Sequence, residues 1–319
     1  MKRQRGVALI IALLAVALAL VLIAGLLDRG ELTLARTTNT LRGEQAQAYA
    51  EGLEAFAARV LVKSQEEGPG IDAADSLWAL PLPPQAVPGG LLTAQMRDLN
   101  GCFNLNNLAP GSGSRQAWLE IFQRLLIGLQ LNVDIADAAA DWTDPSPEGS
   151  GDAWYLGQPV PYRRAARAFN HVSELRLLRN VDSRTYAALA PYVCALPRET
   201  RLNINTASVP VLMSLSDQIT STVAERIWQG GKARYTDVNA FVDLLQTAGV
   251  ADVGRLPGLV STSSNYFEAR GDIELDDIPF SFVSVIERGQ GTGVRVLSRS
   301  RGSDESRLAA AVAQRPATR

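Results

Sequence analysis

The most regular pattern in the chain is an unbroken apolar run near its N-terminus. From residue 7 to residue 27 every residue is apolar, and Gly25 is the only one that lacks a hydrophobic side chain. At about 1.5 Å per residue this run makes a helix about 30 Å long, which is enough to cross the hydrocarbon core of a bilayer. The pattern therefore predicts a membrane-spanning helix.

The predicted helix continues past the membrane as an amphipathic segment. A single apolar stripe at helical period follows the run, and it is formed by Tyr49, Leu53, Phe56, Ala57, Val60 and Leu61. The Gly-Pro-Gly sequence at residues 68–70 ends the helix. We therefore predict one long helix that reaches residue 67 and lays the apolar face of its second half on a folded domain.

The rest of the chain divides by composition and periodicity. Strand-like composition occurs in residues 91–99, 266–270, 280–288 and 294–299. The apolar spacing is helical, with a period of about 3.6, in residues 117–129, 133–142, 183–193, 209–215, 219–228 and 238–245. Because the helices fall between the first strand and the last three, the predicted fold class is α+β: a long N-terminal helix packed on a small antiparallel β-sheet, with a large all-α domain inserted.

The six residues before the apolar run contain Lys2, Arg3 and Arg5 and end in Gly6. Their charge holds the N-terminus in the cytoplasm, so the rest of the chain faces the other side of the membrane. A secretory signal peptide would have a shorter apolar core and a small-x-small cleavage site. A plain single-pass anchor is the simplest alternative. The glycine directly before the helix favours a third interpretation, a prepilin-type leader that is cleaved after Gly6 and leaves Val7 first.

Charge and cysteine content narrow the function classes. The net charge of the 319 residues is −2 and the isoelectric point is about 5.6, so the chain lacks the basic surplus typical of nucleic-acid binders. The two cysteines, Cys102 and Cys194, can form one disulfide if the domain lies in an oxidising compartment, as export implies. The alternative is a pair of buried free thiols.

The leader and helix resemble those of type IV pilins and type II secretion pseudopilins. Most members of these families carry glutamate as the fifth residue of the mature chain, and here that position is Ile11. Four stretches then resemble the large K-type minor pseudopilins of type II secretion systems over nearly the whole chain: RDLNGCFNLNNL at 97–108, ADWTD at 140–144 running to DAWY at 152–155, VSELR at 172–176, and LNINTA at 202–207.

The resemblance implies a division of the chain and a function. The expected parts are a leader at 1–6, a transmembrane helix at 7–27, its periplasmic continuation at 28–67, a β domain at 68–100 and 265–302, a helical domain at 101–264 with SAM-like or helix-hairpin-helix-like halves, and a flexible tail at 303–319. The implied protein is methylated at Val7, sits in the bacterial inner membrane with a periplasmic C-terminal domain, and caps the secretion pseudopilus. Its implied partners are I-type and J-type minor pseudopilins, prepilin peptidase and the inner-membrane assembly platform.

An uncharged residue at position 11 suits a tip subunit. A carboxylate inside the bilayer is costly unless it is paired, and in the family it is thought to pair with the N-terminal amine of the neighbouring subunit nearer the tip. A subunit with no neighbour above it has no such partner. Ile11 is therefore the less costly residue at a tip.

An acidic loop is the main candidate for a ligand site. Asp141, Asp144, Glu148 and Asp152 lie in a loop rich in proline and glycine. Carboxylates at irregular spacing suit calcium, which takes six to eight oxygen ligands, and the resemblance implies calcium at this loop. Ser146 and Gly151 stand where relatives tend to carry acids. The alternative is a solvated acidic loop without a metal, and no other cofactor is expected.

Other chemistry has little support in the sequence. His171 is the only histidine, without a cysteine or a second histidine near it, and no nucleophile motif is present, so we predict no enzyme activity. The stretches at 103–108 and 202–207 share one asparagine pattern, and the second resembles the opening of a helix-hairpin-helix module. The hairpin at 216–219 contains Asp217 and no glycine, which argues against DNA binding. A minor pilin of a type IV pilus or DNA-uptake system is the alternative function, and a single-pass envelope enzyme is the third.

Overall fold

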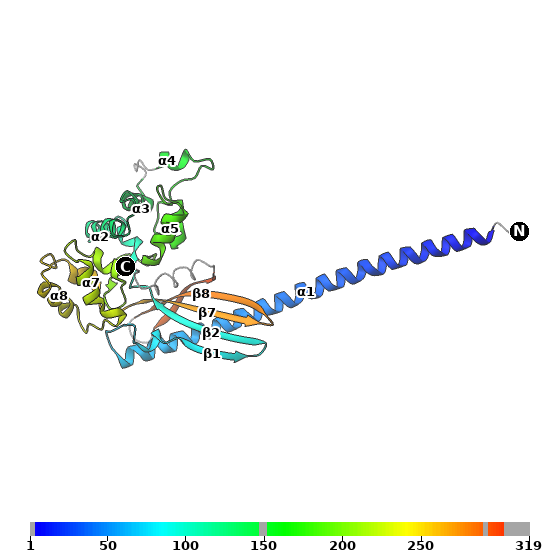
Figure 1. Ribbon diagram of the computed structural model, residues 1–319, viewed down its shortest axis with the longest axis horizontal. Helices are drawn as coiled ribbons and strands as arrows, with labels where there is room; N and C mark the ends of the chain where they lie inside the picture. The colour runs from blue at the N-terminus through cyan, green and yellow to red at the C-terminus, as the bar shows by residue number, and fades with distance from the viewer. Residues whose placement is uncertain (1–3, 147–151, 290–292, 303–319) are drawn as a thin grey trace.

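The computed structural model describes residues 4–146, 152–289 and 293–302. A long helix carries a folded head along its C-terminal part (Figure 1). The head consists of a β-sheet that lies beside the helix and a group of helices beyond the end of the sheet. This α+β architecture confirms the predicted fold class.

Helix α1 (Gln4–Glu67) runs without a break over 64 residues, which is about 96 Å at 1.5 Å per residue. It ends where the Gly-Pro-Gly sequence begins, and Gly70 has a φ of +78° that glycine adopts easily. Most of the predicted stripe packs on the head, because Ala57 and Leu61 are buried and Tyr49, Leu53 and Val60 lie against the core. Phe56 is the exception and is 47% exposed.

The sheet has five strands in the order β1-β2-β7-β8-β9, and every neighbouring pair is antiparallel. Its strands are β1 (Leu82–Val87), β2 (Gly90–Asp98), β7 (Tyr266–Leu275), β8 (Ile278–Arg288) and β9 (Val294–Arg301). The four predicted strands are present, and three of them are longer than predicted. Strand β1 was not predicted, because its two prolines lack the N–H groups of a regular strand.

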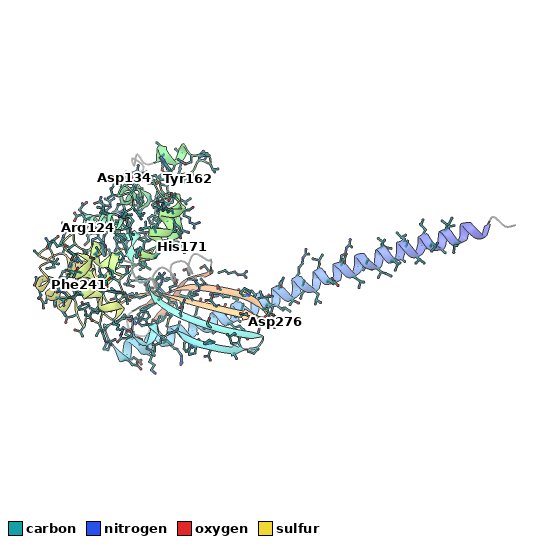
Figure 2. All side chains as sticks on the ribbon, viewed as in Figure 1. Arg124, Asp134, Tyr162, His171, Phe241 and Asp276 are labelled. Carbon is teal, nitrogen blue, oxygen red and sulfur yellow. The ribbon has the colours of Figure 1, made fainter. Side chains whose placement is uncertain are left out.

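Apolar side chains join α1 to one face of the sheet. Ala46 and Ala50 of α1 pack with Leu92, Ile273 and Phe282, and further along α1 the core continues to Phe267 and Ile286. At the membrane-proximal end, Arg42 of α1 forms an ion pair with Asp276 in the turn between β7 and β8. Figure 2 shows Asp276 at that turn, next to the helix.

The helical part lies between β2 and β7 in the chain. Its first half contains β3 (Phe103–Asn104), η2 (Leu105–Leu108), α2 (Arg115–Gly128), α3 (Ile135–Thr143), α4 (Asp152–Leu156), η3 (Val172–Leu177), α5 (Ser183–Leu189), η4 (Ala190–Tyr192) and β4 (Val193–Cys194). Its second half contains β5 (Leu202–Asn203), α6 (Val209–Ser214), α7 (Ser221–Trp228), η5 (Gln229–Gly231), α8 (Val238–Thr247), α9 (Leu256–Leu259) and β6 (Val260–Ser261). One hydrophobic core runs through both halves and includes the fully buried Phe241 (Figure 2).

The two halves share one hydrogen-bond pattern, in which a buried asparagine side chain bonds to both the carbonyl and the N–H of one distant residue. The side chain of Asn106 donates to the carbonyl of Phe169 at 2.9 Å and accepts from its N–H at 2.7 Å. Asn205 makes the same pair of bonds with Tyr235, at 3.1 and 2.7 Å. Each asparagine follows a two-residue strand, and these strands form parallel pairs, β3 with β4 and β5 with β6. The shared asparagine pattern of the sequence therefore has a structural counterpart.

Candidate functional site

From Leu9 to Leu27, α1 presents an apolar surface that none of the described residues covers. Gly6 and Val7 lie in the first turns of the helix, and Ile11 is 63% exposed. The large apolar side chains from Leu9 to Leu27 are more than half exposed, although water disfavours such surface. Among the described residues, α1 is the one helix long and apolar enough to cross a membrane.

The second half of α1 is fixed to the sheet by a carboxylate. Glu54 accepts hydrogen bonds from Ser284 of β8 and from Arg299 of β9. Burial by itself raises the pKa of Glu54, but the bonds from Arg299 and Ser284 outweigh it and lower that pKa below its ordinary value. This charge-assisted contact sets the position of the helix on the sheet.

A buried polar cluster lies where the sheet meets the helical part. One carboxylate oxygen of Asp98, at the end of β2, accepts hydrogen bonds from Asn203, Thr206 and Ser264. Burial raises the pKa of Asp98 to about 6, although the bonds from Ser264 and Thr206 act in the opposite direction. The donors come from β5, from the turn after it and from the loop before β7, so the cluster joins the two parts of the head.

A buried ion pair extends this cluster towards α1. Arg288, at the end of β8, forms an ion pair with Asp72, and their side chains are 5% and 2% exposed. Asp72 also accepts hydrogen bonds from the Trp78 indole at 3.0 Å and from the Ser264 N–H at 2.8 Å. Sequence reasoning missed these residues, because single charged residues at the end of a strand or in a turn are normally solvated.

The structure brings Cys102 and Cys194 together but holds both as free thiols. Both are buried, and both thiols donate to the carbonyl of Leu99, at 2.9 and 3.4 Å. Burial, together with the hydrogen bond to the Cys102 thiol, raises the pKa of Cys194 well above its ordinary value. The predicted proximity is therefore present, whereas the disulfide itself stays a prediction.

Two of the described acids of the candidate calcium loop, Asp141 and Asp152, form ion pairs with arginines. Arg164 donates to the carbonyl oxygens of Asp141 at 2.9 Å and of Ser146 at 2.5 Å, and it forms an ion pair with Asp152 at 3.4 Å. Its side chain is only 5% exposed. The Asp141 carboxylate lies 3.5 Å from Arg179.

Asp144, the remaining acid of this loop that the structure describes, has a partner within the loop. The carboxylate of Asp144 accepts from the Ser146 N–H at 2.8 Å, and Glu148 lies outside the described residues. Within the described ranges no three histidine, cysteine or acidic side chains converge on one point. Because a buried guanidinium already binds two carbonyls and one carboxylate of the loop, the described residues do not fit a calcium ion by themselves.

His171 has a local structural role. It precedes η3, where its ring nitrogen Nδ1 accepts from the Ser173 N–H at 3.2 Å, while Glu174 accepts from the His171 N–H at 3.3 Å. This is a reciprocal helix cap. Figure 2 shows His171 on the helical part of the head. His171 is therefore an exposed residue whose described hydrogen bonds belong to the cap.

The hairpin at residues 216–219 is held by contacts within the chain. Arg124 of α2 donates to the carbonyl oxygens of Ser214 and Leu215 just before it, at 2.7 and 3.2 Å. Gln218 accepts from the Ala251 N–H at 2.6 Å. These bonds connect the hairpin and the residues just before it to α2 and to the residues after α8.

A membrane-length helix whose second half packs on a small antiparallel sheet defines a pilin-like subunit, and this one, with its enlarged helical head, is a minor pseudopilin. Two family models, both described as type II secretion system protein K, match residues 101–198 and 202–263. The chain belongs to this family.

Whole-chain relatives agree with the family models. The chain is 35% identical to the type II secretion system protein K of Pseudomonas aeruginosa over 315 residues, which cover 94% of this chain and 93% of the relative. It is 33% identical to the protein of the same name from Aeromonas hydrophila over 329 residues, which cover 95% of this chain and 99% of the relative.

A solved structure extends the likeness to the fold. The chain is similar to a chain in the crystal structure of the GspK-GspI-GspJ complex from the enterotoxigenic Escherichia coli type 2 secretion system. The TM-score is 0.73 at 28% identity, and the match covers 84% of this chain and 99% of that chain.

Proposed function

We propose that this chain is the tip subunit of a type II secretion pseudopilus and helps to start its assembly. The observation that carries the proposal is Ile11, which is apolar at the position where most pseudopilins have glutamate. The head supports it as well, because the helices beyond the sheet make it much larger than the part that packs on α1 (Figure 1). A large head is more easily placed at the end of a filament than within it.

The proposed partners are I-type and J-type minor pseudopilins, in line with the complex that contains the similar structure. Prepilin peptidase would remove residues 1–6, and the assembly platform of the inner membrane would receive the mature subunit. The folded head would then lie in the periplasm, on the side opposite Lys2, Arg3 and Arg5. We propose a structural role without catalysis and without nucleic acid.

Processing is tested by mass spectrometry of the chain purified from its own membrane. We expect a mature chain that begins at Val7 with a methylated amine. A chain that begins at Met1, or one cleaved beyond Leu27, would rule out the prepilin leader.

The tip position is tested with the Ile11→Glu variant. A tip subunit has no neighbour above it to supply an amine, so the new carboxylate would cost about 2.5–3.5 kcal/mol in the hydrocarbon if charged, less what its own N-terminus relieves. We expect secretion at or below the wild-type level, and the subunit confined to the filament end in immunogold images. The conservative Ile11→Leu variant is the control. Incorporation of Ile11→Glu along the whole filament would contradict the proposal.

A further inference from the structure

Leucines recur at every seventh position along α1, and the described residues leave all of them exposed: Leu13, Leu20, Leu27, Leu34 and Leu41. Val16 and Ile23 add the intervening apolar positions of the first repeats, and both are more than half exposed. A seven-residue apolar repeat is the seam of a coiled coil, in which one helix covers the leucines of another. The repeat therefore indicates that this side of α1 packs against a second helix.

Lipid can cover only the first part of this leucine stripe. Leu34 and Leu41 lie about 10 and 21 Å beyond Leu27, the last residue of the apolar run, at about 1.5 Å per residue. They are 69% and 59% exposed, and exposed leucine side chains are unfavourable in water. Because the stripe begins inside the membrane segment and continues beyond it, a helix that covers the whole stripe must itself be anchored in the membrane.

The sheet leaves this side of α1 open. Each residue turns the helix by about 100°, so Leu41 lies about 140° around the axis from Ala46, which is buried against the sheet. Ala48 and Gly52 lie within about 20° of Leu41 around the axis, and both are exposed. A Cβ added to Gly52 would meet nothing within 4 Å. These small residues allow a second helix to lie close to α1 beside the head.

An apolar pocket opens farther along the same flank of α1. Its volume is about 200 Å³, and it lies between α1, the sheet and the segment that leads into β1. Phe56 and Leu80 are the exposed large hydrophobic residues of its lining, at 47% and 60%. Phe56 lies about 60° around the helix from Leu41. A helix that follows the leucine stripe therefore reaches the mouth of the pocket.

The lining of the pocket suits a large apolar side chain. An apolar cavity of about 150 Å³ holds benzene and stays dry, so this volume fits a leucine, methionine or phenylalanine side chain. The charged groups of the lining already have partners within the chain. Glu54 accepts from Arg299 and Ser284, and Arg270 forms an ion pair with Asp272. A polar ligand would therefore gain little there.

We propose that a membrane-anchored helix of another pseudopilin lies along the leucine stripe and inserts one large apolar side chain into this pocket. The inference rests on the proposed function, because a subunit that occurs once at the tip must find its helical partner in a different subunit. The leucines hold the two helices together. The pocket fixes their register, because a side chain that enters it prevents the partner from sliding along α1.

The test uses the full chain, tagged at its C-terminus, in membranes that contain the other pseudopilins. The photo-crosslinker p-benzoylphenylalanine replaces Leu80 at the pocket mouth. The control site is Gln47, which is exposed and lies about 180° around α1 from Phe56. After irradiation we expect an adduct between the Leu80 probe and the N-terminal helix of another pseudopilin, identified by mass spectrometry. The Gln47 probe should give no such adduct.

The outcomes of this experiment separate the inference from the function on which it rests. If the other pseudopilins co-purify with the chain but the Leu80 probe reacts only with lipid or detergent, the pocket assignment is wrong and the proposed function stands. If no other pseudopilin co-purifies with the wild type, or if the adduct joins two copies of this chain, the tip function and the inference both fail.

Two pairs of variants test the pocket and the stripe separately. Ala57→Leu fills the pocket from α1, so the co-purified partner should fall about threefold or more while the Tm stays the same or rises. Gln47→Leu is its control and should change neither. Leu41→Ser should reduce the partner by a similar factor. Leu32→Ser, at an equally exposed leucine about 180° around the helix, should leave it unchanged.

The variants also state what would overturn the proposal. A raised Tm of Ala57→Leu with an unchanged amount of partner would show that the pocket is only a packing void. Equal losses of partner for Leu41→Ser and Leu32→Ser would show that the seven-residue stripe does not select one side of α1.

Discussion

Arg299 of the last strand binds Glu54 of α1 through two hydrogen bonds, Nε to Oε1 at 2.7 Å and Nη2 to Oε2 at 2.5 Å. The two residues are 245 positions apart, and the Glu54 side chain is only 9% exposed. A planar guanidinium matches a carboxylate in this paired geometry, which a lysine cannot reproduce. The contact therefore fixes both the rotation and the height of the helix on the sheet.

Removal of this carboxylate should loosen α1 from the head. We expect Glu54→Gln to lower the free energy of unfolding by about 2 kcal/mol at pH 7, because Arg299 loses its paired carboxylate and keeps only the single bond to the exposed Glu51. The matched control is Glu51→Gln, since Glu51 is exposed and contacts Arg299 through one bond of 3.1 Å. That variant should cost less than about 1 kcal/mol.

Low pH should remove the contribution of the Glu54–Arg299 contact to the free energy of unfolding. The pKa of Glu54 is lowered in the folded protein, so its contribution is present above the unfolded pKa of about 4.3 and is lost as the pH falls below it. Urea unfolding of the full chain in detergent at pH 7 and at pH 3.5 measures both effects. Equal losses for Glu54→Gln and Glu51→Gln would show that the paired geometry contributes nothing.

The Asp98 carboxylate should give the opposite pH dependence. Its folded pKa of about 6 lies above the unfolded value of about 3.9. The folded protein therefore binds a proton between these values that the unfolded chain does not, and the cost of ionisation, present above pH 6, is relieved as the pH falls. We expect this group to add about 2 kcal/mol of stability between pH 7 and pH 4.

Comparison with Asp98→Asn isolates this effect from those of other acids. The variant should be less stable overall, because the three donors on one oxygen fix the amide oxygen there and the NH2 group cannot accept the hydrogen bond that the other carboxylate oxygen takes from the Asn100 N–H at 2.7 Å. Its stability should lack the gain on acidification. Parallel pH curves for the wild type and the variant would contradict the raised pKa.

The buried thiols should form a disulfide once the head reaches an oxidising compartment. Cys102 and Cys194 lie next to the same Leu99 carbonyl, and the closed loop spans 92 positions. A loop of this length gains about 4 kcal/mol in the chain-entropy model, less any strain. Non-reducing peptide mapping of the native protein should find the linked peptides.

If both thiols are free, they should at least be inert. Burial raises the pKa of Cys194, so the thiolate that reacts with alkylating reagents is scarce in the folded protein. Iodoacetamide should then label the cysteines only after denaturation. Free thiols that react rapidly in the folded protein would contradict both the disulfide and the buried position.

Arg164 should stabilise the acidic loop without a divalent cation. We expect Arg164→Met to lower the Tm of the full chain by about 5 °C or more, because the variant leaves Asp152 and two loop carbonyls without their partner. Arg163→Met is the control, since Arg163 is exposed. The wild type should have the same Tm in EGTA as in about 5 mM calcium, a concentration that would fill a calcium site of millimolar affinity. A clear rise with calcium would restore the metal site implied by the acidic sequence.

The local pattern of the sequence was enough to predict most of the main helices and strands. The apolar run and the stripe after it predicted α1, and the Gly-Pro-Gly turn predicted where it ends. Helical spacing predicted the main helices of the inserted part, with ends that moved by a few residues. Strand β1 was not predicted, because Pro83 and Pro84 argue against a regular strand. The structure places them in an irregular stretch of an edge strand, where missing N–H groups are tolerated.

The surroundings of the candidate sites could not be predicted, because residues far apart in sequence form them. The acids of the acidic loop are near one another in sequence, and in the fold Arg164 pairs with Asp152 and Arg179 with Asp141. Gly101 lies in the turn after β2. A Cβ at that position would lie 2.8 Å from the Thr206 carbonyl oxygen, so the glycine permits the close approach of the sheet to the helical part.

The sequence by itself determined the membrane helix, the order of helices and strands and, by resemblance, the protein family. These depend on which side chains are apolar and at what spacing, and that information is local. Only the tertiary structure decided that Asp72, Asp98 and Arg288 share one buried cluster with Ser264. The physical reason is that a polar side chain has no fixed role in sequence. Its charge, its hydrogen bonds and its pKa are set by the groups that folding places around it.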